Sequence, residues 1–277
     1  MTTIAIPATA AGPARAGWFT QTGQVLRRWL IVTVRQVWGP VMSLVQPIIW
    51  ILLFGQVFRS LGELPQFAPS AGSGTGGYIA YLVPGILMMT VLYSGAWAGT
   101  GYIDDINSGV MDQYLSSPIR RSAIITGQLT QQLIVNVVQS LVVLGIGWLG
   151  GARYPGGVGG LLVALGVATL LATIFCCAST AIALISRNQI ALISLSQLIV
   201  LPATFLSTTM MPSALLPDWV AAVARWNPMT WAVELGRGGL SGEYPDAAWL
   251  QLAGLVALAA LAFTWAVRSI RAYQRSI

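Results

Sequence analysis

The sequence predicts an all-α integral membrane protein with six transmembrane helices. Of its 277 residues, 56% are hydrophobic and only 8% are charged, whereas a soluble domain carries roughly 25% charged residues. Apolar runs of about 20 residues, the length that crosses the hydrocarbon core of a bilayer, recur along the chain. None of the expected spans contains Asp, Glu or Arg. The spans are about 41–58, 78–101, 124–149, 160–185, 190–210 and 247–267.

The composition also excludes several kinds of functional site. All basic residues are arginines, so a phosphate-binding loop that needs a lysine is ruled out. Histidine is absent, which removes the usual proton shuttle and the commonest metal ligand. Cys176 and Cys177 are adjacent within an apolar run, so we interpret them as small membrane residues. We expect no metal site, no cofactor bound by this chain, and no nucleic-acid partner.

The arginines predict the orientation of the chain. Ten of the fourteen fall on one side of the six expected spans. These ten are Arg15, Arg27, Arg28, Arg35, Arg120, Arg121, Arg187, Arg268, Arg271 and Arg275. Because cytoplasmic loops carry the excess of basic residues, both termini are expected in the cytoplasm.

Residues 1–17 are rich in Ala, Pro and Thr, and we expect a disordered tail before a single transmembrane domain over 18–277. The segment Trp18–Trp38 has the pattern of an amphipathic helix at the membrane surface. Its polar face includes Arg28, whose head is expected among lipid phosphates. An earlier start of the first span is the alternative.

Between spans two and three lies a polar interruption, 104–121. A single short helix is expected from Asp105 to Leu115, and Ser117-Pro118 is expected to cap and start the next helix. Such a helix suits contact with a separate protein, with apolar side chains flanking Asp112. From these residues alone, a generic surface loop is an equal alternative.

The third expected span carries polar residues on one helical stripe, namely Gln128, Gln132, Asn136 and Gln139. Hydrogen bonding between helices is one interpretation, worth about 0.6 kcal/mol per contact. A polar wall of a translocation path is the other.

Before the last span, residues 215–239 form two amphiphilic pieces too short to cross, which predicts outer re-entrant helices. Asn227 is expected to cap the second piece and Pro228 to occupy its first turn. Glu234 and Arg237 are three residues apart on that helix and are expected to pair.

The motifs resemble a known family. The run Asn107-x-Gly109-x-x-Asp112-x-Tyr114-Leu115-x-Ser117-Pro118-Ile-x-Arg121 is similar to the signature of type-two ABC exporter permeases, in particular the daunorubicin-exporter-like ones. A second stretch resembles the family's outer region, running from Pro217 through Trp226-Asn227-Pro228 to Glu234 and Arg237. The sequence departs from the usual pattern at Asn107, where an acid is common, and at Gln113, where many relatives have Arg.

The resemblance implies that the chain is not itself an enzyme. ATP and Mg²⁺ would be bound by a separate ABC ATP-binding subunit, present in two copies, and a second permease chain, identical or paralogous, would complete the complex. The residues implied in contact with the ATPase are Asp105, Asn107, Gly109, Asp112, Tyr114, Leu115, Pro118 and Arg121. An outer lid would contain Trp226, Asn227, Pro228, Glu234 and Arg237.

The expected function is export of a hydrophobic or amphiphilic drug, antibiotic or lipid across the inner membrane of a bacterium, with membrane lipid as surroundings. Export of a lipid-linked glycan is the alternative within the family, and a non-transporting membrane scaffold is an alternative outside it. A proton-coupled antiporter is disfavoured, because such proteins place ionisable residues within the bilayer and these spans contain no Asp, Glu or His.

Overall fold

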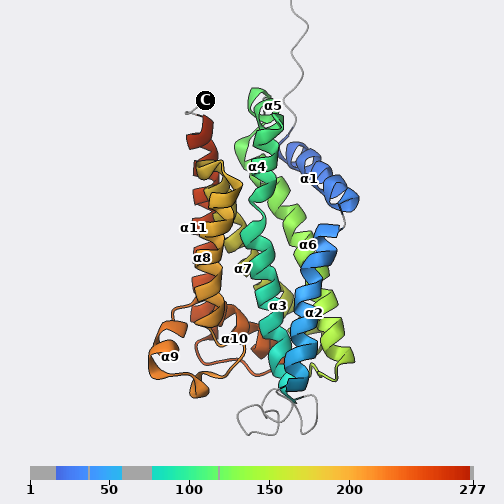
Figure 1. The fold of residues 1–277 in the computed structure, drawn as a ribbon, viewed down its shortest axis with the longest axis vertical. Coiled ribbons are helices and arrows are strands. Elements are labelled where there is room, and N and C mark those ends of the chain that lie inside the picture. Colours follow the sequence, from blue (N-terminus) through green and yellow to red (C-terminus); the bar gives the residue numbers. More distant parts are fainter. Residues whose placement is uncertain (1–16, 37, 58–76, 118, 275–277) are drawn as a thin grey trace, which may run out of the picture.

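The computed structural model describes residues 17–36, 38–57, 77–117 and 119–274. The expected tail lies almost wholly outside this range, as does Pro118. The described part is built from helices with no strand, as the composition predicts (Figure 1). The helices are α1 (Trp18–Arg35), α2 (Trp38–Val57), α3 (Gly77–Trp97), α4 (Thr100–Asn107), α5 (Val110–Ser116), α6 (Arg121–Leu149), α7 (Gly157–Ser186), α8 (Gln189–Phe205), the 3₁₀ turn η3 (Ser213–Leu215), α9 (Asp218–Ala224), α10 (Pro228–Ser241) and α11 (Ala248–Gln274).

Four helical segments are long and apolar enough to cross a membrane. They are Tyr78–Asn107, Arg121–Leu149, Gly157–Ser186 and Ala248–Arg271. Two further apolar helices, Val41–Gly55 and Gln189–Phe205, are shorter. They coincide with the first and fifth expected spans. The fifth was expected to reach residue 210, but α8 stops at Phe205, and a buried turn through Ser207 and Thr209 follows.

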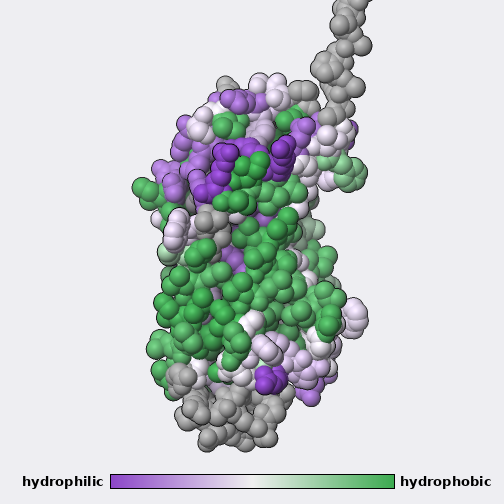
Figure 2. Space-filling model, turned by 90° about the vertical axis from the view of Figure 1, so that its right-hand side faces the viewer, coloured by the Kyte–Doolittle hydropathy of each residue, from purple (hydrophilic) through white to green (hydrophobic). Residues whose placement is uncertain are grey.

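The molecule has two polar ends. Helices α1, α4 and α5 and the end of α11 lie at one end, and α9 and α10 lie at the other (Figure 1). Most described arginines belong to the first end, whereas Arg153, Arg225 and Arg237 belong to elements at the second. A broad hydrophobic belt separates a strongly hydrophilic first end from the second (Figure 2). This distribution is typical of a protein whose middle faces lipid.

Helix α3 lies at the centre of the bundle. Leu82, Val83 and Leu87 are fully buried, and the helix is apolar on every side, as expected for a central helix. Elsewhere small residues permit very close packing. A Cβ atom on Gly160 of α7 would lie only 1.8 Å from the carbonyl oxygen of Gly239 in α10. Small residues at such crossings drive association of helices in membranes.

The helix is interrupted between α3 (ending at Trp97) and α4 (beginning at Thr100), and side chains of other helices bond to the backbone there. The amide of Gly99 donates to Ser179 Oγ at 3.0 Å, and Ser179 Oγ donates to the carbonyl of Ala96. The carbonyl of Ala98 accepts from Gln128 Nε2 at 3.0 Å. Freed backbone groups within a bilayer need such partners. The junction is therefore a defined point at which α4 is attached to α3.

Candidate functional site: the α4–α5 end and the amide groove

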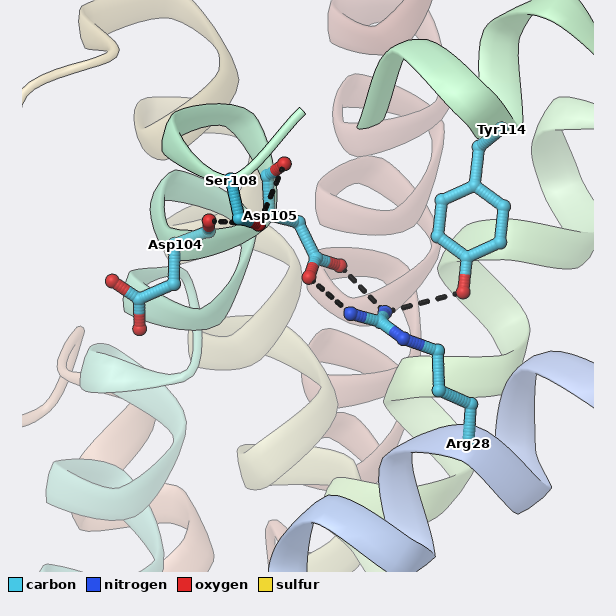
Figure 3. Close-up of polar contacts among 5 residues, drawn as sticks. All are labelled: Arg28, Asp104, Asp105, Ser108 and Tyr114. Carbon is cyan, nitrogen blue, oxygen red and sulfur yellow. Dashed lines mark hydrogen bonds and ion pairs between the residues drawn. The ribbon is translucent and has the colours of Figure 1, made fainter. Parts of the chain in front are cut away.

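An ion pair joins three helices at the arginine-rich end. Arg28 of α1 donates to both carboxylate oxygens of Asp105 in α4, with a 2.7 Å bond to Oδ2, and it also donates to Tyr114 Oη of α5 at 3.1 Å (Figure 3). The guanidinium also lies 5.5 Å from the centroid of the Tyr114 ring. Two parallel bonds fix both groups in one orientation. We name Arg28, Asp105 and Tyr114 the Arg28 cluster.

Within the Arg28 cluster, the surroundings shift the pKa values of Arg28 and Tyr114 upward. Asp105 is 5% exposed, so its carboxylate depends on the arginine for compensation. Hydrogen bonding to Asp105 raises the pKa of Arg28 above its ordinary value. Burial raises the pKa of Tyr114, which the nearby arginine partly opposes. The phenol therefore stays protonated near neutral pH.

The expected single helix from Asp105 to Leu115 is wrong: two short helices replace it. Helix α4 ends at Asn107, and α5 begins at Val110. Gly109 separates them with φ of 73°, a left-handed conformation that suits glycine because it has no side chain. The glycine of the motif is therefore a turn residue, and it lets α5 start in a new direction.

Helix α5 has one anchored side and one exposed side. Met111 is fully buried in a cluster that includes residues of α4, α6, α7, α8 and α11. Asp112 and Gln113 are exposed, as are Asn107 and Arg121 nearby. The exposed polar side chains of α5 are therefore accessible to solvent, while the buried side of the helix fixes its position on the bundle.

The start of the helix that forms the third expected span also differs from expectation. Ser117 Oγ donates to the carbonyl of Gln113 at 2.8 Å, closing the end of α5. Helix α6 begins at Arg121, with Arg120 at its cap. The backbone amide of Arg120 donates to Gln21 Oε1 of α1 at 3.0 Å. The side chain of Gln21, not a local Ser-Pro signal, therefore supports this helix start.

Helix α1 is amphipathic, and its buried face contains a polar residue. Gln21, Val25 and Trp29 are buried, whereas Phe19 is 83% exposed. Arg28 was expected among lipid phosphates and instead binds Asp105. The buried carboxylate in α4 offers the guanidinium a desolvated, bidentate partner, which water-exposed phosphates do not provide.

The polar stripe of α6 lines a cavity of about 410 Å³ between α1, the start of α2, the α3–α4 segment and α6. We call this cavity the amide groove. Gln128, Gln132 and Gln139 line it, and Gln131 joins them. Asn136 is absent from the lining and is buried, and its amide atoms have no hydrogen-bond partner among the described residues.

The glutamines also form hydrogen bonds between helices, which is the first of the two interpretations of the stripe. Gln131 Nε2 donates to Thr33 Oγ1 of α1 at 2.8 Å, and Gln132 Nε2 donates to Ser94 Oγ of α3 at 2.7 Å. Gln139 Nε2 donates to Ser43 Oγ of α2 at 2.6 Å. The wall of the groove is thus held in place by its own amide nitrogens.

At the opposite end, α10 begins as predicted. Asn227 Oδ1 accepts from the amide of Met229 at 2.9 Å, and Pro228 is in the first turn. Asn227 Nδ2 also donates to the carbonyls of Ala203 and Leu206, tying α10 to the end of α8. Trp226 beside it is 81% exposed.

The expected pairing of Glu234 with Arg237 is not observed among the described residues. Arg237 donates to the carbonyls of Tyr81 and Thr209 at 3.2 and 2.8 Å, and its guanidinium lies 3.5 Å from the centroid of the Tyr81 ring. Glu234 accepts from Gln251 Nε2 of α11 at 2.6 Å. Backbone carbonyls of α3 and of the turn after α8 are close enough to satisfy the arginine without the neighbouring carboxylate.

Arg28 and Trp29 are residues of the site that sequence reasoning missed. Both line the amide groove. The sequence has three arginines in α1 and three acids in the 104–121 interruption, but nothing in it indicates which arginine meets which acid.

The sequence is similar to those of known transport permeases. The chain is 26% identical over 200 residues to the daunorubicin resistance ABC transporter permease protein DrrB1 of Streptomyces coeruleorubidus. That alignment covers 71% of this chain and 66% of the relative, slightly less than two thirds of its length. Identity to the ycf38 transport permease is 25% over 212 residues for Cyanophora paradoxa and 24% over 223 residues for Pyropia yezoensis. These alignments each cover 76% of this chain, and 70% and 72% of the relatives. A family model matches residues 20–240, and the chain belongs to the ABC-2 type transporter family.

Proposed function

We propose that this chain is the permease subunit of an ATP-driven exporter that moves an amphiphilic drug, antibiotic or lipid out of the cell. In this proposal α2 and α8 cross the membrane together with the four long segments, giving six spans with both termini in the cytoplasm. A separate ATP-binding subunit, in two copies, binds ATP and Mg²⁺, and a second permease chain completes the pathway.

The observation that carries the proposal is the geometry of α5. It presents Asp112 and Gln113 to solvent at the arginine-rich end, while Met111 anchors its other side in the core. An exposed helix on a rigid base suits contact with a second protein. Membership of the ABC-2 type transporter family makes an ATP-binding subunit the natural partner.

The Arg28 cluster supports a mechanism of transmission. A push on α5 reaches α4 through their shared core contacts, and α4 is attached to α3 at Gly99. The same push reaches α1 through Arg28. Because α1, α4 and α6 line the amide groove, their relative movement changes its width. Packed elements of this kind switch between discrete arrangements. The region around Trp226 and Asn227 acts as the lid at the outer end.

Copurification tests the proposal. The tagged chain is purified from its native host, and the proteins bound to it are identified by mass spectrometry. The preparation is then reconstituted in proteoliposomes, and ATP-dependent movement of a dye across their membrane is measured. We expect an ABC ATP-binding subunit in the wild-type preparation and loss of both that subunit and dye movement in Asp112→Arg.

The matched control is Asp218→Arg, an exposed acid in the first turn of α9 at the opposite end. It is expected to retain the ATP-binding subunit. Retention of that subunit and of dye movement in Asp112→Arg would reject the role assigned to α5. Dye movement without any ATP-hydrolysing partner would reject the function itself.

A further inference from the structure

The end of α11 shares a core with α5. Both lie at the same end of the molecule (Figure 1). Tyr273, in the last turn of α11, is 5% exposed, and it belongs to the same buried cluster as Met111 of α5 and Leu192 of α8. The helix that ends the described chain therefore packs into the base on which α5 lies.

An arginine with an unusual backbone conformation covers Tyr273. Arg187 is the C-cap residue of α7, and its guanidinium carbon lies 4.5 Å from the centroid of the Tyr273 ring. The face of an aromatic ring attracts a cation at this distance. Within the described ranges, Arg187 is the only residue other than glycine with a positive φ, at 50°. Such strain persists where the surrounding structure enforces it and is common at functional sites. The contact with Tyr273 explains why an arginine stands where glycine would be unstrained.

Asp112 connects this contact to the exposed side of α5. Burial raises the pKa of Tyr273, the carboxylate of Asp112 raises it further, and the charge of Arg187 opposes both effects. Both charged groups must lie near the phenol to act on it in this way. We name Asp112, Arg187 and Tyr273 the Tyr273 cluster. Helix α5 thus takes part in two sets of arginine and tyrosine contacts, one with α1 through Arg28 and Tyr114, and one with α7 and α11.

At the opposite end of the molecule, α7 and α11 hold α10. Helix α10 packs against both of them, and they pack along each other. The amide of Gly156, just before α7, donates to the carbonyl of Leu240 in α10 at 2.9 Å. Gln251 of α11 donates to Glu234 of α10 at 2.6 Å. The three helices therefore form one unit, which we name the α7–α10–α11 unit.

This unit extends from the Tyr273 cluster to α10. Helices α7 and α11 have 30 and 27 residues, which correspond to lengths of about 45 and 40 Å at 1.5 Å per residue. They run from the end that carries α5 to the end that carries α10 (Figure 1). Packed helices shift between discrete arrangements and do not deform continuously. A displacement at Tyr273 is therefore carried to α10.

We propose that the Tyr273 cluster couples α5 to the position of α10 at the opposite end of the molecule. Tyr273 and Arg187 are positioning residues, which hold the α7–α10–α11 unit against α5. With the contact intact α10 has one position, and with the contact released it has more than one. The inference rests on the proposed export function, to which it adds a route from the ATP-binding subunit to the outer lid. This route is separate from the one through Arg28 to α1.

Distances between spin labels in the chain alone test the coupling. The labels are attached at Arg225→Cys, just before α10, and at Leu149→Cys, at the end of α6; both positions are exposed, and the buried Cys176 and Cys177 are retained. Pulsed electron paramagnetic resonance in phosphatidylcholine nanodiscs gives the distance distribution. We expect one narrow distribution with Tyr273 present. In Tyr273→Ala, the ratio of released to held positions is expected to rise about fivefold, as suits the loss of a contact between a cation and a buried ring.

Three further variants assign the effect to the contact. Tyr273→Phe keeps the ring and is expected to give the wild-type distribution. Arg187→Gly removes the guanidinium and suits the positive φ, so it is expected to match Tyr273→Ala without a change of backbone conformation. Arg271→Ala removes an exposed arginine two residues before Tyr273 and is the matched control, with no expected effect. An unchanged distribution in Tyr273→Ala or in Arg187→Gly would overturn the proposal, as would a Tyr273→Phe variant that behaves like Tyr273→Ala.

A second pair of labels distinguishes coupling from general loosening of the bundle. Val57→Cys, at the end of α2, and Leu149→Cys are both exposed, and neither belongs to the α7–α10–α11 unit. The distance between these labels is expected to stay the same in Tyr273→Ala. If both pairs of labels broaden equally, Tyr273 only stabilises the fold and the proposal is wrong.

Reconstitution with the ATP-binding subunit separates this inference from the export function. The amount of dye moved per ATP hydrolysed is expected to fall about fivefold in Tyr273→Ala, while the subunit stays bound because Asp112 is unchanged. An unchanged amount of dye per ATP would overturn the inference and leave the export function standing. Dye movement without any ATP-hydrolysing partner would reject the export function, and the label distances in the chain alone would still decide whether Tyr273 controls the position of α10.

Discussion

Removal of Arg28 leaves the buried carboxylate of Asp105 without its ion-pair partner. The expected loss of free energy of unfolding depends on how deeply the two side chains are buried. The Asp105 side chain is 7% exposed, and that of Arg28 is 32% exposed. Breaking a fully buried ion pair by deleting one partner costs about 3–5 kcal/mol. Because the Arg28 side chain is about one third exposed, we expect Arg28→Ala to lower the free energy of unfolding by roughly 2–3 kcal/mol.

The double substitution provides the sharper test. Asp105→Asn removes the unpaired negative charge. In the Arg28→Ala background it is therefore expected to restore about 1–2 kcal/mol of the free energy of unfolding. In the wild-type background the same substitution is expected to destabilise, because Arg28 loses its bidentate partner. The sign of the Asp105→Asn effect therefore reverses between the two backgrounds.

Reversible unfolding in mixed micelles, by titration with dodecyl sulfate, measures the free energies of unfolding of the wild type, the two single variants and the double variant. Arg27→Ala removes an exposed arginine next to Arg28 and is the control, with an expected effect within about 0.5 kcal/mol. If Asp105→Asn destabilises the Arg28→Ala protein further, or if the two single effects simply add, the ion pair does not join α1 to α4 as described.

Further predictions concern backbone geometry and capping, and the same unfolding titration measures them. Gly109→Ala is expected to cost about 1–2 kcal/mol because its φ of 73° is left-handed, whereas Gly23→Ala, in open space on α1, is expected to be neutral or stabilising; equal effects would contradict the turn at 109. Gly160→Ala places a Cβ 1.8 Å from a carbonyl oxygen of α10 and is expected to cost several kcal/mol by forcing α7 and α10 apart, whereas Gly159→Ala, with nothing within 4 Å, is expected to cost little. Asn227→Ala loses the helix cap and two bonds to backbone carbonyls and is expected to cost about 2–3 kcal/mol. Asn227→Asp keeps the cap acceptor and is expected to lie between the wild type and Asn227→Ala; a cost equal to that of Asn227→Ala would show that the cap contributes nothing.

Much of the architecture could be predicted from local pattern. The long apolar runs specify helices because the bilayer leaves backbone groups no other partners. The cap at Asn227 and the proline after it are local signals, and both were predicted correctly. The amphipathic character of α1 was also evident, although its buried face was not, since the inward side of a helix depends on what it packs against.

The site residues also divide into those that local sequence pattern predicts and those that depend on the packing of helices. Gln128, Gln132 and Gln139 share a face because helical periodicity fixes it, and they line one cavity. Asn136 shares their stripe but lies outside the lining, because the neighbouring helices close over it. The break at Gly109 could have been suspected from glycine itself, but the sequence does not reveal that its φ is positive.

The sequence by itself determined that this chain is helical, which parts of it are apolar enough to enter a bilayer, and which end carries most of the positive charge. These properties follow from composition and from interactions within about one helical turn. Only the tertiary structure decided that Arg28 binds Asp105, 77 residues away, that Arg237 turns to backbone carbonyls instead of Glu234, and that amide side chains of α6 line a groove between helices. Such pairings depend on how whole helices pack, because desolvation and distance, not sequence spacing, select each charged group's partner.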